Sequence, residues 1–409
     1  MRGGNRLGAG RKVIPESEKK KRKSVYITDK LYTRIMDTDI ENCNNFSQKC
    51  MALIELAMEN LNKNNQEHSV KRNNILMVRD TKSTYNKTNN NFEKQNRGIK
   101  LTFIDLFAGI GGIRLGFEDK YTKCVFSSEW DKYAAQTYEA NYGEKPHGDI
   151  TKINENDIPD QDVLLAGFPC QPFSNIGKRE GFAHERRNII FDVLRILKKK
   201  QPKMFLLENV KGLLTNDNGN TFRVILDNLK SLGYSVFYEV MDAQNFGLPQ
   251  RRERIVIVGF HPDLGINDFS FPKGNPDNKV PINAILEHNP TGYSISKRLQ
   301  ESYLFKKDDG KPQIVDFRCT YQVNTLVASY HKIQRLTGTF VKDGETGLRL
   351  FSELELKRLM GFPVDFKVPV SRTQMYRQFG NSVAVPMIKA VAGAMKERLL
   401  LAEMQVLKK

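Results

Sequence analysis

Cysteine and tryptophan are scarce in this chain, which has five cysteines and one tryptophan among 409 residues. No two cysteines have C-x-x-C spacing; they are Cys43, Cys50, Cys124, Cys170 and Cys319. An odd number without paired spacing argues against a disulfide framework and against a zinc knuckle. We therefore expect a protein of a reducing cytoplasm that holds no metal ion.

Long apolar runs are also missing, since none reaches the roughly 18 residues that a membrane span needs. The start, MRGGNRLGAGRK, is basic but has no apolar core, so we expect no signal peptide. Negative charge is in short supply, because 47 Asp and Glu face 64 Lys and Arg, which gives a net charge of +17. A protein this basic is expected to bind a polyanion, most simply nucleic acid; a generally basic enzyme is the alternative.

The first part of the chain is basic and then polar. After EKKKRK (18–23), the alternation in SVYIT predicts a short strand, and helical patterns follow over roughly 30–40 and 46–61. Residues 1–61 resemble a ribbon–helix–helix module, which pairs strands of two subunits in the DNA major groove. The alternative is a solvated charge run leading a small helical appendage. Residues 62–98, rich in Asn and Lys, are predicted to be a flexible linker.

From residue 99 onward, strand-like runs alternate with helical patterns. The predicted strands cover 101–107, 123–130, 162–168, 203–210, 234–241 and 254–260. Such alternation is typical of a mainly parallel, doubly wound α/β sheet. The alternation lapses from about 262 to 345, and helices are expected over 351–363 and 383–400. The predicted domains are the sheet domain 99–261, a smaller irregular domain 262–348, and a C-terminal segment 349–409 that completes the sheet domain.

A glycine turn follows the first predicted strand, in FIDLFAGIGG (103–112). Gly109 and Gly111 allow a sharp turn and the close approach of a ligand. Glu129 ends the next strand 20 residues after Gly109, an offset that suits a carboxylate holding two ribose hydroxyls. Trp130 follows it and offers an apolar face to a purine. These features predict a nucleoside cofactor. NAD and S-adenosylmethionine (SAM) both fit, although Arg114 replaces the third glycine of the dinucleotide pattern; a purely structural turn is the alternative.

Cys170 lies in AGFPCQPFSNIGKREGF (166–182), just past the strand predicted over 162–168. Ligands bind at the carboxyl edge of open α/β sheets, and Pro169 and Pro172 stiffen this loop. The neighbours of Cys170 are polar or basic, which favours the nucleophilic thiolate. These neighbours are Gln171, Ser174, Lys178 and Arg179. A buried, inert thiol is the alternative for a free cysteine.

One carboxyl group is expected at the same edge as Cys170, and two arginines stand at the start of a later strand. Glu208 closes the next strand, in LLENV, where a carboxyl group suggests an acid or a hydrogen-bond donor. Arg252 and Arg254 lie on one face as the strand over 254–260 begins. A strand-end cap is the alternative for Glu208, and a solvated basic face is the alternative for the two arginines.

These segments form an ordered series: DLFAGIGG, SEWD, GDI, GFPCQPFS, ENV, QRRERI and QFGNSVAVP. From residue 101 to about 400, the chain resembles the DNA (cytosine-5)-methyltransferases, which have this motif order. No D-P-P-Y or N-P-P-Y motif is present, which argues against methylation of exocyclic amines. The resemblance implies a Rossmann-like, SAM-dependent enzyme that acts on double-stranded DNA, releases S-adenosyl-L-homocysteine (SAH) and needs no metal.

The resemblance also implies a mechanism in which the target cytosine is flipped out of the duplex and the Cys170 thiolate adds to C6. Glu208 would contact N3 and the exocyclic amine, while Arg252 and Arg254 would orient the base and its phosphate. Carbon C5 would then take the methyl group, a water would remove the C5 proton, and Cys170 would leave. The implied cofactor residues are Phe107, Gly109, Gly111, Glu129 for the ribose, Trp130, Asp149 for the adenine amine, Ile150, Pro169, Asn381, Ser382 and Val383.

The irregular domain is then expected to recognise the target. The segments 291–312 and 325–350 resemble the MspI-type group of the family, modification enzymes that recognise CCGG and methylate the outer cytosine. The candidate DNA-binding residues are Gln171, Ser174, Lys178, Arg179, Arg298, Thr325, Lys332, Gln334 and Arg335.

We therefore predict a cytoplasmic, nucleoid-associated enzyme of a prokaryotic type II restriction–modification system. Its catalytic part is expected to be monomeric, while the N-terminal module is a candidate for dimerisation and for binding an operator to regulate transcription. A tRNA cytosine-5 methyltransferase, a DNA-binding regulator that uses residues 1–61 and an inactive descendant are the alternatives. The presence of Cys170, Glu208, Arg252 and Arg254 disfavours the last.

Overall fold

The computed structural model describes residues 101–169, 189–277 and 279–406. All of them belong to the larger of two compact units, Met77–Lys409. Several predictions fall outside these ranges: the module 1–61, the linker 62–98, and the loop residues Cys170, Gln171, Ser174, Lys178 and Arg179.

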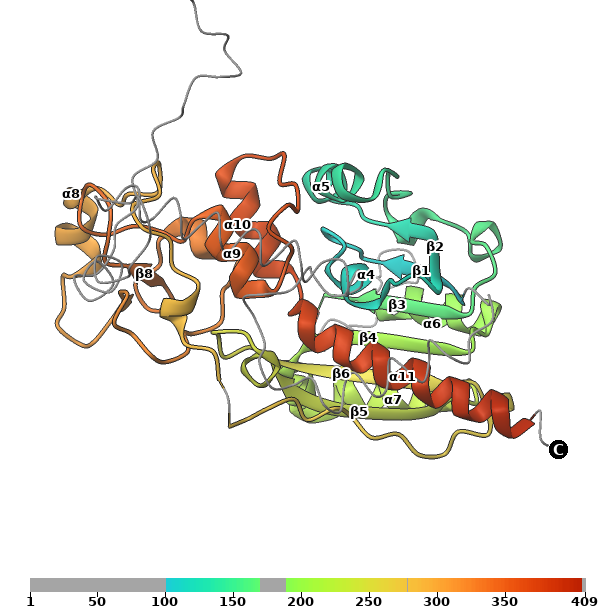
Figure 1. Ribbon diagram of the computed structural model, residues 1–409. Helices are drawn as coiled ribbons and strands as arrows, with labels where there is room; N and C mark the ends of the chain where they lie inside the picture. Colours follow the sequence, from blue (N-terminus) through green and yellow to red (C-terminus); the bar gives the residue numbers. More distant parts are fainter. Residues whose placement is uncertain (1–100, 170–188, 278, 407–409) are drawn as a thin grey trace, which may run out of the picture. The chain divides into compact units, whose positions relative to one another are not determined.

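A six-stranded sheet with the order β2-β1-β3-β4-β6-β5 forms the centre of this unit (Figure 1). The strands are β1 (Leu101–Leu106), β2 (Thr122–Ser128), β3 (Val163–Gly167), β4 (Met204–Val210), β5 (Ser235–Asp242) and β6 (Glu253–Phe260). The pairs β1–β2, β1–β3 and β3–β4 are parallel, whereas β6 runs antiparallel to both β4 and β5. All six predicted strands are present, each within two residues of its predicted ends.

The reversed direction of β6 has a local cause and a consequence for the site. Only residues 243–252 join β5 to β6, and a connection this short suits an antiparallel pair rather than a parallel crossover. Because β6 is reversed, its first residues lie at the edge where the parallel strands end, with Arg254 opposite Val210 of β4. The end of β4, in LLENV, and the start of β6, in QRRERI, thus lie at the same edge of the sheet.

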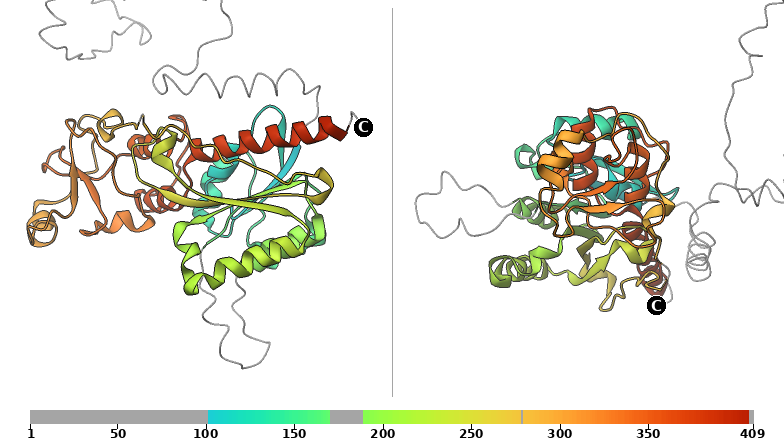
Figure 2. Two further views of the ribbon diagram at one scale, coloured as in Figure 1. Left: turned by 90° about the horizontal axis from the view of Figure 1, so that it is seen from below. Right: turned by 90° about the vertical axis from the view of Figure 1, so that its left-hand side faces the viewer.

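Helices cover both faces of the sheet because the residues of its central strands are apolar on both sides. The helices are α4 (Gly112–Phe117), α5 (Lys132–Tyr142), α6 (Ile190–Lys200), α7 (Asn220–Ser231), α8 (Lys297–Leu299), α9 (Glu353–Met360), α10 (Arg372–Asn381) and α11 (Val385–Val406). Phe103, Leu165 and Leu206 share one core with α4 and α11. Ile104 and Leu207 share another core with α6 and α7. Figure 2 shows α11 and α7 on opposite sides of the sheet.

The smaller domain has a separate core and little regular structure. Its two strands, β7 (Gln313–Val315) and β8 (Thr339–Val341), form a parallel pair. Its core joins apolar residues between 282 and 351 to those of α9 and α10. Within the C-terminal segment 349–409, α11 packs on the core between the sheet and α4, whereas α9 and α10 belong to the core of the smaller domain. No helix among the described residues is long and apolar enough to span a membrane.

Candidate catalytic and cofactor-binding site

The turn after β1 has a backbone that requires glycine. Phe107, Gly109 and Gly111 have φ angles of 54°, 56° and 83°, in the left-handed region that side chains disfavour. A Cβ added to Gly109 would meet nothing within 4 Å, so the space beside this residue is open. A Cβ added to Gly111 would collide with the ring of Tyr142, whose hydroxyl donates a 2.7 Å hydrogen bond to the Gly111 carbonyl. The turn is therefore closed on one side and open on the other.

Glu129 holds this turn against the end of β2. Its carboxylate accepts hydrogen bonds from the backbone N–H of Gly109 at 2.8 Å and of Asp131 at 2.7 Å. Burial raises the pKa of Glu129, and these backbone hydrogen bonds oppose the rise. Trp130, next in the chain, is 77% exposed. A fixed carboxylate and an exposed aromatic face thus lie beside the open glycine turn.

Two other predicted cofactor segments lie close to this turn. A Cβ added to Gly112 would lie 2.6 Å from Ser382 Oγ and 3.0 Å from Val383 Cγ2, so residues 382–383 pack against the start of α4. On the other side, the His147 N–H donates to the Ser127 carbonyl of β2 at 2.9 Å, which brings the following Asp149 to the same strand end as Glu129.

Asp149 and Ile150 have local partners of their own. The Asp149 carboxylate accepts hydrogen bonds from the N–H and hydroxyl of Thr151, at 3.1 and 2.8 Å, and so caps a short helix. Ile150 is buried under the sheet. The exposed Pro169 follows β3, and Asn381 ends α10 with its side chain exposed. The open turn, the fixed carboxylate and the exposed indole fit the adenosine half of SAM.

Beneath the turn, Asp105 is fully buried, and neither carboxylate oxygen has a hydrogen-bond partner among the described residues. Burial raises its pKa from 3.8 to about 8, with Arg114 opposing the rise. Between about pH 4 and pH 8, the folded protein therefore keeps this proton, whereas the unfolded chain has lost it. The free energy of unfolding consequently falls as the pH rises across this window.

We expect Asp105→Asn to reduce this pH dependence, because the amide is neutral at every pH in the window. The free energy of unfolding should fall less between pH 5 and pH 8 in the variant than in the wild type. Urea denaturation at the two pH values measures it. An unchanged difference between the two pH values would show that Asp105 is already ionised in the folded protein.

A buried ion pair lies at the other end of the edge. Glu208 of β4 stands opposite Gly167 of β3, the last strand residue before Phe168, Pro169 and Cys170. Arg254 Nε lies 3.1 Å from Glu208 Oε1, and both side chains are nearly buried. Burial raises the pKa of Glu208, while Arg254 and then Arg252 lower it. Glu208 Oε1 is buried and has no hydrogen bond among the described residues, so its contact with Arg254 is an electrostatic one.

Asn209 fixes the point at which the chain leaves β3. Its side-chain amide donates a 2.9 Å hydrogen bond to the Phe168 carbonyl, and its Oδ1 accepts from the Val210 N–H at 2.8 Å. Phe168 stands two residues before Cys170. Asn209 belongs to the ENV motif, but no role for it was predicted from the sequence. A short amide side chain directly after a strand-end carboxylate was the available signal.

We expect Asn209→Ala to lower the rate of methyl transfer by roughly ten- to a hundredfold, since a small misplacement of a reacting group costs that much. SAM and DNA affinities should stay within about twofold, because the buried Asn209 side chain bonds to backbone groups of Phe168 and Val210 rather than to a ligand. Single-turnover rates and binding titrations measure the two quantities. Asn228→Ala, which removes an amide hydrogen bond to Val224 within α7, is the matched control. A loss of DNA affinity as large as the loss of rate would contradict this role.

Arg252 differs from the expectation that it orients the base and its phosphate. The residue is only 1% exposed. Its guanidinium donates to the Leu326 carbonyl at 2.9 Å, to the Gly380 carbonyl at 3.1 Å and to the Ser382 carbonyl. Its two terminal nitrogens donate to backbone carbonyls, while Nε has no hydrogen-bond partner among the described residues. Because the side chain is enclosed, neither direct base contact nor a solvated basic face describes it.

A cleft of about 610 Å³ separates the start of β6 from the smaller domain. Its lining on the sheet side includes Lys211, Arg251 and Arg254. Its lining on the other side includes Asn324, Thr325, Val327, Leu336 and Thr337. Because Arg254 also contacts Glu208, the buried ion pair adjoins this cleft. We call it the catalytic cleft.

The predicted DNA-binding residues of the smaller domain divide into two groups. Arg298, Lys332 and Gln334 are exposed, and Thr325 lines the catalytic cleft. Arg335, in contrast, is buried, and its guanidinium donates to the carbonyls of Leu304 at 3.0 Å and Lys307 at 2.9 Å and to the Asp309 carboxylate. These contacts occupy Arg335 within the domain, so the expectation that it reads a base is not met.

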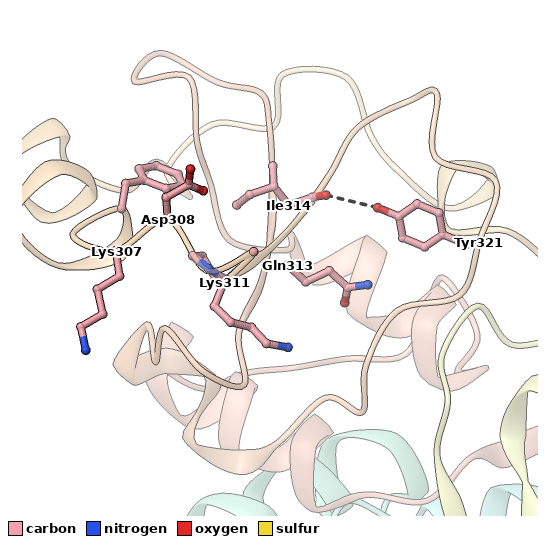
Figure 3. A pocket seen from close by; sticks show the side chains of 9 residues that line it. Lys307, Asp308, Lys311, Gln313, Ile314 and Tyr321 are labelled. Atoms are coloured by element: carbon pink, nitrogen blue, oxygen red, sulfur yellow. Dashed lines mark hydrogen bonds between the residues drawn. The ribbon is translucent and has the colours of Figure 1, made fainter.

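A second hollow, of about 500 Å³, lies in the smaller domain (Figure 3). The half-exposed rings of Phe305 and Tyr321 and the side chains of Lys307 and Lys311 contribute to its lining. Gln313 also lines it, and its Oε1 accepts from the backbone N–H of Asn324, a residue of the catalytic cleft, at 3.1 Å. None of the residues that line this hollow was predicted from the sequence, because no local motif links segments this far apart.

The sheet order, the glycine turn and the strand-end carboxylates define a Rossmann-like α/β fold of the methyltransferase class. Within the described ranges, no group of three or more His, Cys, Asp or Glu residues is placed to hold a metal ion. Comparisons with known proteins agree with this class and make it more specific.

The family model of C-5 cytosine-specific DNA methylases matches residues 101–397. The chain is 56% identical to the type II methyltransferase M.MspI of Moraxella sp over 292 residues, which is 71% of this chain and 69% of that protein. It is 44% identical to the type II methyltransferase M.HpaII of Haemophilus parainfluenzae over 326 residues, 73% of this chain and 90% of that one. The crystal structure of S. pombe Dnmt2 methyltransferase matches with a TM-score of 0.59 at 22% identity, covering 75% of this chain and 99% of that one; this likeness bears on the fold alone.

The chain belongs to the C-5 cytosine-specific DNA methylase family. The predicted family, its MspI-type resemblance, the fold class and the assignment as a DNA (cytosine-5)-methyltransferase are confirmed. Members of this family use SAM as methyl donor and act on double-stranded DNA. The N-terminal module lies outside the matched residues and stays a prediction.

Proposed function

We propose that this enzyme methylates C5 of the outer cytosine of CCGG in duplex DNA, through a covalent bond between Cys170 and C6. The buried Glu208–Arg254 pair carries the chemical part of this proposal, because it lies at the end of β4 beside the strand that leads to Cys170. The specificity rests on the likeness to M.MspI, whose 56% identity extends over 292 residues.

The cofactor would be held at the glycine turn. Phe107, Gly109 and Gly111 shape the turn, and Glu129 would contact the ribose with the lone pairs that its backbone bonds leave free. Trp130 offers its exposed face to the adenine, and Asp149 lies at the same strand end for the adenine amine. The remaining residues proposed to contact the cofactor are Ile150, Pro169, Asn381, Ser382 and Val383.

The protein's side chains prepare the cytosine for methylation. The Cys170 thiolate forms a bond to C6, and the electrons of the C5–C6 double bond move to C5, which is otherwise a poor nucleophile. Glu208, whose pKa burial raises, holds a proton toward N3 as negative charge develops there, and Arg254 keeps this carboxyl group in place. When bound, SAM supplies the methyl group that C5 takes up. Water then removes the C5 proton, the C5–C6 double bond re-forms and the Cys170–C6 bond breaks.

The smaller domain would read the target sequence. Thr325 lines the catalytic cleft, and the exposed Arg298, Lys332 and Gln334 are available to bases or phosphates. Gln171, Ser174, Lys178 and Arg179 would contact DNA from the Cys170 loop. Arg with guanine is the commonest specific pairing, worth about 1–3 kcal/mol.

Duplexes with 5-fluorocytosine at either the outer or the inner cytosine of CCGG test the adduct and its position together. Fluorine at C5 leaves no proton to remove, so the enzyme stays attached to a base that it has methylated. Incubation with SAM and a denaturing gel should show attached protein with the outer substitution alone. Attachment at the inner position would refute the specificity. Attachment at neither, with normal methylation of an ordinary duplex, would refute the covalent step.

For the N-terminal segment we propose DNA binding that regulates transcription, supported by its basic arm and by its position outside the residues that match the family model. We expect deletion of residues 1–98 to leave methylation of CCGG intact, because the family match begins at residue 101. The same deletion should abolish binding to the promoter DNA upstream of the gene. Methylation assays and gel shifts with that DNA measure both. Loss of methylation would show that the segment belongs to the catalytic part, and unchanged promoter binding would refute the regulatory role.

A further inference from the structure

We propose that Arg252 is a positioning residue that couples cofactor binding to DNA binding. It would do so by joining residues 380–383, the cofactor segment, to residues 324–327, the cleft segment. This inference rests on the proposed function, which places SAM at the first segment and DNA at the second. It differs from the expectation that Arg252 touches the target base.

The guanidinium of Arg252 forms hydrogen bonds to both segments at once. One terminal nitrogen donates to Leu326 of the cleft segment at 2.9 Å, and the other donates to Gly380 and Ser382 of the cofactor segment. The side chain is fully enclosed, so no water competes for these donors. Burial and the nearby Arg254 lower the pKa of Arg252 to about 9, so the group is charged at pH 7 and its hydrogen bonds are charge-assisted.

The cleft segment is held by the same stretch of chain that contains Arg252. The Arg251 N–H donates to the Val323 carbonyl at 2.8 Å, and the Val323 N–H donates to the Pro249 carbonyl at 2.9 Å. The Leu326 N–H donates to the side chain of Gln250 at 3.2 Å. Any shift of the cleft segment on binding DNA is therefore transmitted to residues 249–252.

The cofactor segment is fixed to the glycine turn and also touches the cleft segment. Ser382 and Val383 pack on Gly112 at the start of α4. At Gly380, an added Cβ would collide with the backbone of Val327 and Ala328, so the two segments are in direct contact. The hydrogen bonds of Arg252 to both segments reinforce this contact. Since ordering one segment also orders the other, the ligand that binds first should reduce the ordering cost for the second.

The test is the effect of SAH on DNA affinity. For the wild type, the dissociation constant of a CCGG duplex is measured with and without saturating SAH, and their ratio is the coupling factor. We expect a wild-type factor of about five or more, within the usual range for coupled sites. In Arg252→Met it should fall close to one, because methionine fills the space but cannot donate. SAH affinity with and without DNA must give the same factor, since coupling is reciprocal.

Arg335→Met is the matched control. Arg335 is also buried and also donates to two backbone carbonyls and one other acceptor, but all of them lie in the smaller domain. It should lower the melting temperature and leave the coupling factor unchanged. Arg252→Lys, which keeps the charge and some donors, should restore part of the factor and serves as the test if the methionine variant does not fold.

A wild-type factor of one, or a wild-type factor retained in both Arg252 variants, would overturn the proposal. A fall of the factor in Arg335→Met equal to that in Arg252→Met would also overturn it, since general destabilisation would then explain both. Failure of the proposed function is recognised separately, because the wild type would then not methylate CCGG although its coupling factor could still be measured on the duplex.

Discussion

Cys170→Ser is expected to abolish methyl transfer, by a factor of more than about 10³, while SAM binding persists. A serine hydroxyl is far less acidic than a thiol and does not supply the nucleophile that must add to C6 before C5 can accept a methyl group. The proposed cofactor residues lie on other segments, around Gly109, Glu129 and Ser382, so the cofactor site should be unaffected.

Tritium transfer from labelled SAM measures the rate, and calorimetric titration measures SAM affinity. Cys319→Ser is the control, since Cys319 lies in the smaller domain away from the β3 edge. Clear residual turnover in Cys170→Ser would contradict the nucleophile assignment. Loss of SAM binding in the same variant would indicate a damaged fold instead.

Glu208→Gln is expected to slow methyl transfer by about 10²–10⁴, the usual contribution of a general acid. The amide keeps the shape of the side chain, but it cannot supply a proton to N3. The substitution also leaves Arg254 buried without a charged partner. The control is Glu239→Gln, because Glu239 of β5 forms an ion pair with the exposed Lys273, so this variant tests the loss of an ion pair alone. A rate near that of the wild type would refute the role of Glu208.

The dependence of the methyl-transfer rate on pH is a second test of the role of Glu208. Burial raises the pKa of Glu208, so its protonated form persists to a higher pH than that of an ordinary glutamic acid. Activity that depends on this proton is lost as the pH rises through the raised pKa. Single-turnover rates of the wild type should show this falling limb, and Glu208→Gln should lack it. A falling limb retained in the variant would assign it to another group.

The sheet was predictable from sequence because its strands are short apolar runs separated by helical patterns, as LTFIDL and VLLAG show. The direction of β6 was not predicted, although the short connection over 243–252 was the available signal. Helix α10 was also missed, because QFGNS had the appearance of a motif with a glycine and an asparagine. In the structure these two residues, Gly380 and Asn381, end the helix rather than break it.

The place of a candidate site residue in the fold was predictable where that residue ends a strand, as with Glu129 and Glu208. It was not predictable where function depends on contacts between distant segments. Arg252 has the sequence context of a substrate-binding residue, but its partners are carbonyls 74, 128 and 130 residues away. Arg335 likewise sits in a basic segment, and only its burial shows that it supports the domain. Charge and spacing identify such arginines without indicating which way they point.

Base-resolution mapping of 5-methylcytosine tests the central claim most directly. Purified full-length protein would be incubated with SAM and an unmethylated plasmid, and in parallel with tRNA, before sequencing. We expect methyl groups at the outer cytosine of CCGG and none in tRNA. Methyl groups at the inner cytosine or in another sequence would contradict the proposed specificity, and methyl groups in tRNA alone would contradict the DNA substrate.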